Sequence, residues 1–247
     1  MNPFLVLFSI ITVISVVISG ILLLMRRKGR GRWRDQEHIH PSLFNFFTTL
    51  YAFFIGFAIV TLWSAFLTAK TNVTREAESL MVVYRTAKHL PGSEGFRQAV
   101  TNYVKTVIDV EWAEMEKNAM SPEANRRFDD IWARIYELKD DPSRSSELYT
   151  NLTEASRQRS TRGTMLQGNL YPPVWVILIF GFISVVYGLY FINREPTVVS
   201  LIYEFMVIFL VLACIYFIYD LDTPFSGLIT VKPDAFRTVY LKMLSLP

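Results

Sequence analysis

The sequence predicts an all-α integral membrane protein with four transmembrane helices and a helical bundle inserted between the second and the third. Apolar stretches at residues 4–25, 44–69, 173–192 and 198–219 each approach the ~20 residues that cross a bilayer as a helix. A polar segment at 70–171 separates the middle two stretches, and its apolar residues recur at the helical spacing of three and four. The second transmembrane helix is expected to continue into the bundle.

This pattern divides the chain into four segments. Residues 1–69 form transmembrane helices 1 and 2 with a basic connecting loop, and residues 70–171 form a soluble four-helix bundle. Residues 172–219 form transmembrane helices 3 and 4, and residues 220–247 form an amphipathic C-terminal tail. We expect that tail to lie on the membrane surface or on the bundle.

The first apolar stretch is predicted to stay in the protein as a membrane helix. No charge precedes it, it is longer than the apolar core of a signal peptide, and no small-residue cleavage site follows it. The six basic residues after it favour the cytoplasmic side of the membrane: Arg26, Arg27, Lys28, Arg30, Arg32 and Arg34. The N-terminus and the bundle are then extracytoplasmic, in a bacterial inner membrane, and Arg194 is cytoplasmic. Alternatively, the basic run binds anionic lipid headgroups or nucleic acid.

Charge and cysteine content exclude several classes of function. The polar segment 70–171 holds fifteen Lys and Arg against fifteen Asp and Glu, so it offers no basic face and we expect no nucleic-acid partner. The single cysteine, Cys214, lies in the fourth apolar stretch and cannot form a disulfide within one chain. Cys214 is expected to pack as a small hydrophobic residue.

Aromatic residues crowd the second apolar stretch. Phe46, Phe53 and Phe57 share one face of the expected helix. In a symmetric oligomer such a face can line a pore and form a hydrophobic constriction that closes by dewetting. The alternative is that the three rings pack against lipid or against other helices.

The polar segment is expected to fold as four antiparallel helices. The first continues the second apolar stretch as far as Pro91 and Gly92, and the second covers about 96–115. The third begins at the capping signal Ser121-Pro122, presents apolar residues at 128–135 and stops at 140–142. The fourth runs from about 143 to 170, before Pro172. An up-down-up-down arrangement suits four helices joined by short connections.

Counting residues from the two expected hairpin tips places charged side chains in one layer. Glu76 lies sixteen residues before Gly92, Glu111 lies nineteen after it, and Arg159 lies seventeen after Pro142. Arg162 falls one turn lower. Glu111, Arg159 and Arg162 continue apolar stripes, so they face inward, where charges persist only with partners.

We therefore predict a charge cluster of Glu76, Glu111, Arg159 and Arg162. The alternative is a widened, wet helix face on which these side chains never meet. A cluster would fix the register of the helices, or it would bind an anion together with Arg157.

One ionisable residue lies inside an apolar stretch. Glu204 is about two turns into the fourth stretch, and a carboxylate at such a depth is a functional hypothesis by default. It could line an ion path or be protonated. Alternatively, it reaches the headgroups or accepts a hydrogen bond from Tyr203 or a neighbouring helix.

Two further places hold residue types that can bind metals. Asp220 and Asp222 follow the fourth stretch and could offer oxygens to a cation such as calcium, but two carboxylates do not specify a site, so turn formation and capping is favoured. The side chains of His38 and His40 point in different directions on a helix and on a strand, so no metal pair is expected.

The common catalytic motifs are missing from the sequence, so we expect no enzyme and no cofactor.

Several short motifs in a fixed order resemble a family of bacterial membrane proteins of unknown function labelled bestrophin-like. They cover about residues 44–240: Phe54-Ile55-Gly56-Phe57, Trp63, Glu76-Ala77, Leu80, Glu111-Trp112, Arg157, Arg159, Arg162, Pro173, Trp175 and Asp222-Thr223-Pro224-Phe225-Ser226-Gly227. The label implies kinship with bestrophins, which are pentameric anion channels with an aromatic neck on the second membrane helix. By that resemblance, Phe46, Phe53 and Phe57 line a pore.

The resemblance also implies that both termini and the soluble mass are cytosolic, opposite to the orientation that the basic run predicts. We find no clear copy of the bestrophin calcium clasp in the sequence. The leading hypothesis is a homo-oligomeric membrane channel, for anions, whose partners are membrane lipid, further copies of itself and small inorganic ions. The competing hypothesis is a membrane-anchored sensor or scaffold whose bundle binds a small molecule or a protein partner.

Overall fold

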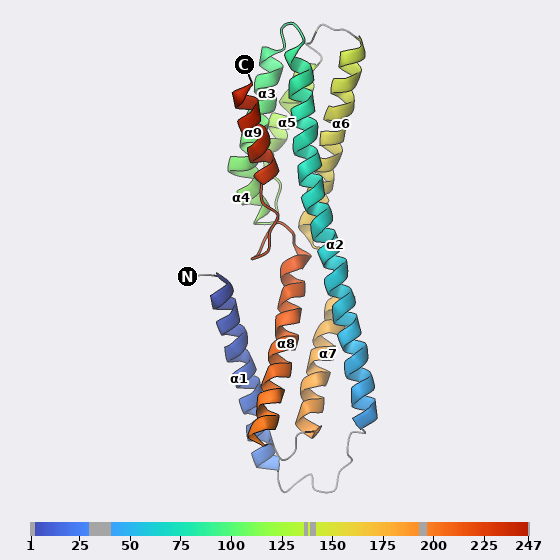
Figure 1. Cartoon of the computed structure of the whole chain (residues 1–247), viewed down its shortest axis with the longest axis vertical. Helices are drawn as coiled ribbons and strands as arrows, with labels where there is room; N and C mark the ends of the chain where they lie inside the picture. Colours follow the sequence, from blue (N-terminus) through green and yellow to red (C-terminus); the bar gives the residue numbers. More distant parts are fainter. Residues whose placement is uncertain (1–2, 30–40, 136–137, 139–141, 193–196, 247) are drawn as a thin grey trace. The chain divides into compact units, whose positions relative to one another are not determined.

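The computed structural model describes residues 3–29, 41–135, 138, 142–192 and 197–246, and the regular elements in these ranges are all helical (Figure 1). The predicted all-α class is confirmed. The α-helices are α1 (Pro3–Gly29), α2 (Pro41–Lys88), α3 (Glu94–Thr106), α4 (Trp112–Met115), α5 (Pro122–Ile135), α6 (Pro142–Thr164), α7 (Pro172–Ile192), α8 (Val198–Asp222) and α9 (Asp234–Ser245). A π-helical turn, η1 (Val107–Glu111), joins α3 to α4, and a 3₁₀ turn, η2 (Met165–Gln167), follows α6.

Four segments of the described chain are long and apolar enough to cross a membrane, as the sequence predicts. They lie in Pro3–Arg27, Ser42–Lys88, Ser146–Ile192 and Val198–Asp222, and the apolar part of the third is α7. The chain is a multi-pass membrane protein.

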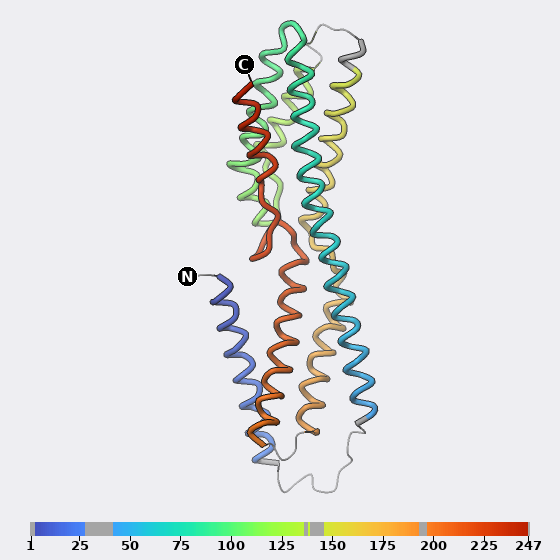
Figure 2. Tube along the Cα trace, viewed as in Figure 1, coloured from blue at the N-terminus to red at the C-terminus, as the bar shows by residue number. Residues whose placement is uncertain are grey.

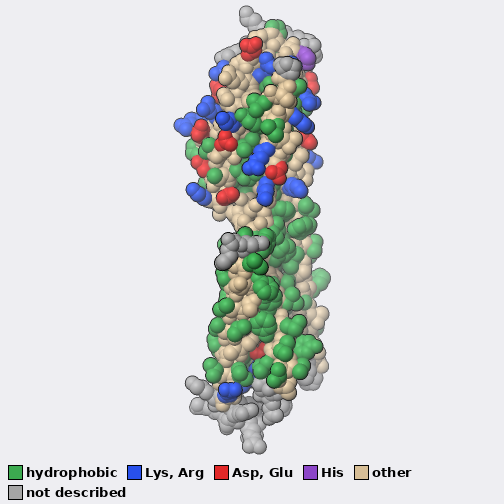
Figure 3. Space-filling view, turned by 60° about the vertical axis from the view of Figure 1, so that its left-hand side comes forward, with side chains coloured by type: hydrophobic (Ala, Val, Ile, Leu, Met, Phe, Trp, Pro, Cys, Tyr) green, Lys and Arg blue, Asp and Glu red, His purple; other side chains and the backbone are tan. Residues whose placement is uncertain are grey.

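The chain divides into two compact units. The membrane unit comprises Met1–Leu62 and Leu170–Asp222, and the bundle unit comprises Trp63–Asn169 and Thr223–Pro247. Helix α2 runs through both without a break, as the sequence predicts for the second transmembrane helix. On the face that Figure 3 shows, charged side chains gather on the bundle unit and apolar side chains cover most of the membrane unit. The four-segment division of the sequence, with bounds after residues 69, 171 and 219, stays a prediction.

Small residues and aromatic rings set the packing of the membrane unit. Helix α8 packs against α1 and α7, and the rings of Phe8 and Phe209 meet edge to face at 5.2 Å. Helix α7 approaches α2 through two glycines: a Cβ atom added at Gly181 would overlap the ring of Tyr51, and one at Gly188 would overlap the ring of Phe44. The Tyr51 hydroxyl donates a hydrogen bond of 2.7 Å to the Leu178 carbonyl. Helices that lack a side chain at the crossing can approach this closely.

The bundle unit differs from the expected four regular helices at two places. The second bundle helix contains the π turn η1, which inserts an extra residue into the helix. The fourth ends earlier than residue 170, because α6 and η2 stop at Gln167 and Gly168 follows with a φ of 73°, a left-handed conformation that suits glycine.

The C-terminal tail packs on the bundle, one of its two expected locations. A linker at 223–233 joins α8 to α9 (Figure 2), and α9 contacts α3 and η1. The Tyr84 hydroxyl of α2 donates to the Met243 carbonyl of α9 at 3.2 Å. The Phe236 and Met243 side chains of α9 are buried. The amphipathic face of the tail therefore belongs to the core of the bundle unit.

Some of the sequence predictions concern residues that lie outside the described ranges. These are the basic residues Arg30, Arg32 and Arg34, the pair His38 and His40, the stop signal at Asp140 and Asp141, and Arg194. Predictions about them stay predictions.

Candidate functional site

A network of two carboxylates and two guanidinium groups lies at the centre of the bundle unit. It joins Glu76 of α2 and Glu111, the last residue of η1, to Arg159 and Arg162 of α6. Arg162 donates to Glu76 through Nε at 2.9 Å and Nη2 at 3.0 Å, and its Nη2 also lies 3.0 Å from Glu111 Oε2. Arg159 donates to the two oxygens of Glu111 at 2.9 and 2.7 Å. The structure thus brings together the three residues that counting along the helices placed in one layer, Glu76, Glu111 and Arg159, and Arg162, which counting placed one turn lower.

Neutral side chains complete the network. The Tyr103 hydroxyl donates to Glu76 Oε1 at 2.7 Å and accepts from Arg159 Nη1 at 2.7 Å. Asn125 Oδ1 accepts from Arg159 Nη2 at 2.7 Å, and the sulfur of Met115 accepts from Arg162 Nη1 at 2.8 Å. Among the described residues, none of the buried polar atoms of the two arginines and two glutamates lacks a hydrogen-bond partner.

Aromatic rings enclose the two arginines. The Arg162 guanidinium lies 5.5 Å from the ring centre of Trp112 and 5.7 Å from that of Phe236. The Arg159 guanidinium lies 5.3 Å from the ring centre of Tyr103 and 5.6 Å from that of Phe128. These distances suit cation–π attraction, which is stronger where water is excluded. The rings come from α3, α4, α5 and α9, so the network ties most of the bundle helices together.

The charges of the network are buried and balanced. Glu76, Glu111 and Arg162 are 0 % exposed and Arg159 is 7 % exposed. Burial alone raises the pKa of Glu111, but the neighbouring Arg162 and Arg159 outweigh it, so this pKa lies below its ordinary value of 4.5. Burial alone lowers the pKa of Arg162, and the carboxylates of Glu76 and Glu111 reverse that effect and raise it. Burial and the adjacent Glu76 raise the pKa of Tyr103.

A second ion pair lies inside the membrane unit. Arg26 Nη1 of α1 is 2.9 Å from Glu204 Oε2 of α8, and both side chains are almost fully buried. Arg26 also donates to the carbonyl groups of Leu189 and Tyr190 at 2.9 and 3.4 Å. The intramembrane carboxylate is therefore paired with the first residue of the basic run. Sequence reasoning assigned Arg26 to the topology signal and missed this role.

The Phe46, Phe53 and Phe57 side chains form one exposed stripe along α2. They are 70, 73 and 64 % exposed in the single chain. Phe44 and Tyr51, which pack against α7, precede Phe46 and Phe53 by two residues each, or about 200° around the helix. Helix α2 thus has one aromatic face packed within the chain and a nearly opposite aromatic face that nothing in the described chain covers.

Comparison with known proteins identifies the family to which this architecture belongs. The family profile of the Bestrophin-like domain matches residues 11–236, nearly the whole chain. The chain belongs to the bestrophin-like family. The resemblance inferred from the sequence is confirmed. No curated protein matches this bestrophin-like chain.

Solved structures share the fold of this bestrophin-like chain. A crystal structure of a bacterial bestrophin homologue from Klebsiella pneumoniae, phased with zinc, matches with a TM-score of 0.70 at 13% sequence identity, covering 95% of this chain and 96% of that chain. A point variant of a Klebsiella pneumoniae homologue matches with a TM-score of 0.71 at 12% identity, covering 96% and 97%. At sequence identities this low, the matches show that the chains share a fold and nothing more.

The two aspartates after the fourth apolar stretch make protein contacts in this bestrophin-like chain. Asp222 Oδ1 accepts a hydrogen bond of 2.7 Å from the Leu170 amide, just before α7, and Asp220 is 3 % exposed. Within the described ranges, no three or more His, Cys, Asp and Glu side chains are grouped to hold a metal ion.

Several residues that complete or enclose the charge network were absent from the predicted cluster, among them Tyr103, Trp112 and Phe236. Tyr103 precedes Glu111 by eight residues, or about two turns, and so lies on the same helix face, a signal that was available. Trp112 is adjacent to Glu111 and donates from its indole nitrogen to the Val231 carbonyl at 3.1 Å. Phe236 comes from the tail, whose position beside the network no local pattern predicts.

Proposed function

We propose that this bestrophin-like protein is a homo-oligomeric membrane channel that conducts anions. The observation that carries the proposal is the exposed stripe of Phe46, Phe53 and Phe57 on α2. Membership of the bestrophin-like family supports it.

The stripe suits a pore because of its chemistry and its position. Three large apolar rings face away from the chain along a helix that is apolar enough to cross the membrane. In a ring of identical copies, the same stripe of each copy faces the common axis and narrows it. A narrow apolar constriction controls ion passage through the ease with which it is wetted.

The charge network takes a structural role in this proposal. Its two positive and two negative charges cancel, and its hydrogen-bonding atoms are used within the chain. An anion would have to displace Glu76 or Glu111 from a guanidinium group to bind there. Arg157, the third arginine of the alternative anion site, is exposed and pairs with Glu154 at 3.2 Å. The network therefore fixes the register of the bundle, which in a channel would form a vestibule.

The membrane orientation is a separate part of the proposal. The basic run after α1 favours an N-terminus and a bundle outside the cytoplasm, in a bacterial inner membrane, whereas the family resemblance implies a cytosolic bundle. A cysteine placed at the exposed Lys105 of the bundle, with Cys214 replaced by alanine, can be labelled by a membrane-impermeant maleimide in intact cells. Labelling supports the extracytoplasmic orientation, and labelling only after lysis contradicts it.

Anion flux from liposomes tests the channel directly. Purified protein is reconstituted, and chloride efflux is compared for the unaltered chain, Phe53→Ala and Phe180→Ala. Phe180 lies on α7 and is 64 % exposed, so it matches Phe53 in residue type and exposure without belonging to the stripe. We expect chloride flux in the unaltered chain, a several-fold change with Phe53→Ala and none with Phe180→Ala. The absence of selective anion flux from the unaltered protein contradicts the proposal.

The sensor or scaffold hypothesis makes the opposite prediction. A membrane part that only anchors the bundle needs no ring of copies and no continuous aqueous path. A strictly monomeric protein without flux would support it.

A further inference from the structure

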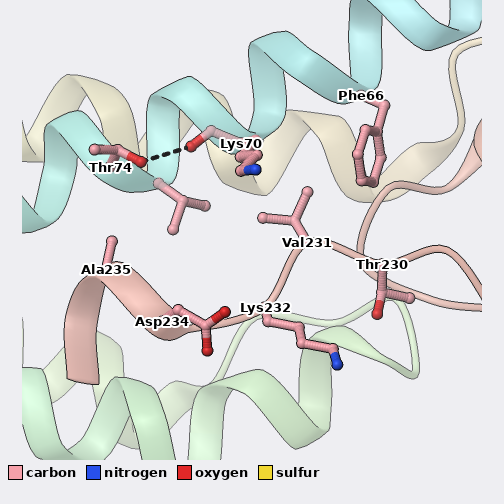
Figure 4. A pocket seen from close by; sticks show the side chains of 9 residues that line it. Phe66, Lys70, Thr74, Thr230, Val231, Lys232, Asp234 and Ala235 are labelled. Carbon is pink, nitrogen blue, oxygen red and sulfur yellow. Dashed lines mark hydrogen bonds between the residues drawn. The ribbon is translucent and has the colours of Figure 1, made fainter. Parts of the chain in front are cut away.

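A cavity of about 190 Å³ lies within the bundle unit, between α2 and the segment that leads into α9 (Figure 4). Lys70 and Phe66 of α2 line one side, and Thr230, Lys232 and Asp234 line the facing side. The cavity is separate from the charge network and from the Phe46, Phe53 and Phe57 stripe. It has room for a group of the size of a phosphodiester.

From the position of Lys70 along α2, we expect one wall of this cavity to lie at the membrane surface. Lys70 is the first charged residue of α2, after 29 uncharged residues at 41–69. Trp63, seven residues earlier, is 44 % exposed, and exposed tryptophan is enriched at the interface between hydrocarbon and headgroups. Seven residues of helix rise ~10 Å, so the Lys70 ammonium reaches headgroup depth.

The cavity carries a positive charge. Lys70 and Lys232 are exposed, and among the described residues neither ammonium group forms an ion pair within 4.0 Å. Asp234 contributes one negative charge, which leaves a balance of one positive charge. A singly charged phosphodiester would neutralise it.

The remaining walls suit a lipid better than a free ion. Phe66, Val73 and Val231 are nearly fully buried and give the cavity an apolar floor. The Thr74 hydroxyl donates to the Lys70 carbonyl at 3.1 Å, so its hydrogen is not available to a ligand (Figure 4). The two ammonium groups and the Thr230 hydroxyl are the donors that remain, and the apolar floor can meet the glycerol and first acyl carbons of a lipid.

We propose that this cavity binds the phosphodiester of an anionic phospholipid headgroup. Lys70 and Lys232 pair with the phosphate oxygens from opposite sides, and the lipid links α2 to the C-terminal segment. Inorganic phosphate shares the charge chemistry, but it has no apolar part to place against Phe66 and Val231. The proposal does not depend on ion conduction.

Lipid binding to the detergent-solubilised full chain tests the site. Native mass spectrometry measures the retention of phosphatidylglycerol and phosphatidylcholine by the unaltered protein and by Lys70→Ala/Lys232→Ala. The control variant is Lys105→Ala/Lys117→Ala, which removes two exposed lysines of the bundle unit away from the cavity. Basic residues near an anionic surface each change affinity about fivefold, so the double variant should lose about 25-fold for phosphatidylglycerol.

Three further results distinguish a lipid site from a site for a free anion and from adsorption of any lipid. Lys70→Arg/Lys232→Arg should restore binding, and Asp234→Asn should tighten it, because it removes the one negative charge of the cavity. Millimolar inorganic phosphate should not displace the lipid. Equal retention of both lipids, unchanged affinity of the double alanine variant, or displacement by inorganic phosphate would each overturn the proposal.

Discussion

Arg162 and Glu76 form a bidentate ion pair in the core of the bundle unit, with Nε 2.9 Å from Oε2 and Nη2 3.0 Å from Oε1. Neither side chain has any exposed surface. Two charges removed from water in this way are stable only together, because each alone would carry the full desolvation cost. The pair therefore makes the bundle sensitive to the loss of either partner.

Arg162→Met is expected to destabilise the protein by about 3–5 kcal/mol, because it leaves the Glu76 carboxylate buried without its main partner. The measurement is the thermal unfolding midpoint of the purified protein in detergent. Arg157→Met is the matched control, since the Arg157 side chain is 73 % exposed. It should change stability by less than about 0.5 kcal/mol. Equal midpoints for the two variants would show that the buried pair is unimportant.

Protonation of Glu111 at acid pH should lower the stability of the bundle unit. Its pKa in the folded protein lies below the ordinary 4.5, so its ionised form stabilises the fold above that pH, and this contribution is lost as the pH falls through the lower, folded value. Thermal midpoints between about pH 3 and pH 7 measure the effect. Glu111→Gln should be less stable at neutral pH and should lose part of the acid dependence. An unaltered acid dependence in this variant would rule out Glu111 as the cause.

Glu204→Gln should destabilise the membrane unit, because Arg26 then lies buried beside a neutral amide. The expected loss is about 3 kcal/mol. Arg26→Met/Glu204→Met, which removes both charges, should recover most of it, while Arg27→Met at the neighbouring exposed position should have little effect. The thermal midpoints of these variants and of the unaltered chain form the test. A double variant that is less stable than Glu204→Gln would contradict this prediction, because it would show that an unpaired charge on Arg26 is not the main cause of the loss.

Gly181→Ala should disturb the crossing of α7 and α2, because the added Cβ overlaps the Tyr51 ring and the Tyr51–Leu178 hydrogen bond must shift. Overpacking of this kind costs about 1–3 kcal/mol. Gly20→Ala is the control, since nothing lies within 4 Å of an added Cβ at Gly20. Thermal midpoints of the two variants should differ clearly, with Gly181→Ala lower. Equal midpoints would mean that α7 moves away from α2 at no cost.

Helix length and charge spacing were readable from the sequence, and contacts between distant segments were not. The rise of a helix per residue is constant, so counting from the turns near Gly92 and Pro142 placed Glu76, Glu111 and Arg159 in one layer. The π turn at Val107–Glu111 and the burial of Phe236 depend on tertiary packing. The periodicity of the local sequence predicts neither the π turn nor the burial of Phe236.

The pairing of Arg26 with Glu204 shows the same limit. Each residue lies near the end of its own helix, and both ends were placed on the same side of the membrane by the four-span topology. Which of the four helices are neighbours is decided by packing, here of α1 against α8. The sequence pattern could therefore predict that Glu204 needs a partner, but it could not name Arg26.

The oligomeric state of the protein in lipid nanodiscs, seen by single-particle electron microscopy, tests the central claim most directly. We expect a closed ring of copies around a central axis, with Phe46, Phe53 and Phe57 of every copy facing that axis. A monomeric particle would contradict the account. So would a closed oligomer in which the Phe46, Phe53 and Phe57 side chains face lipid.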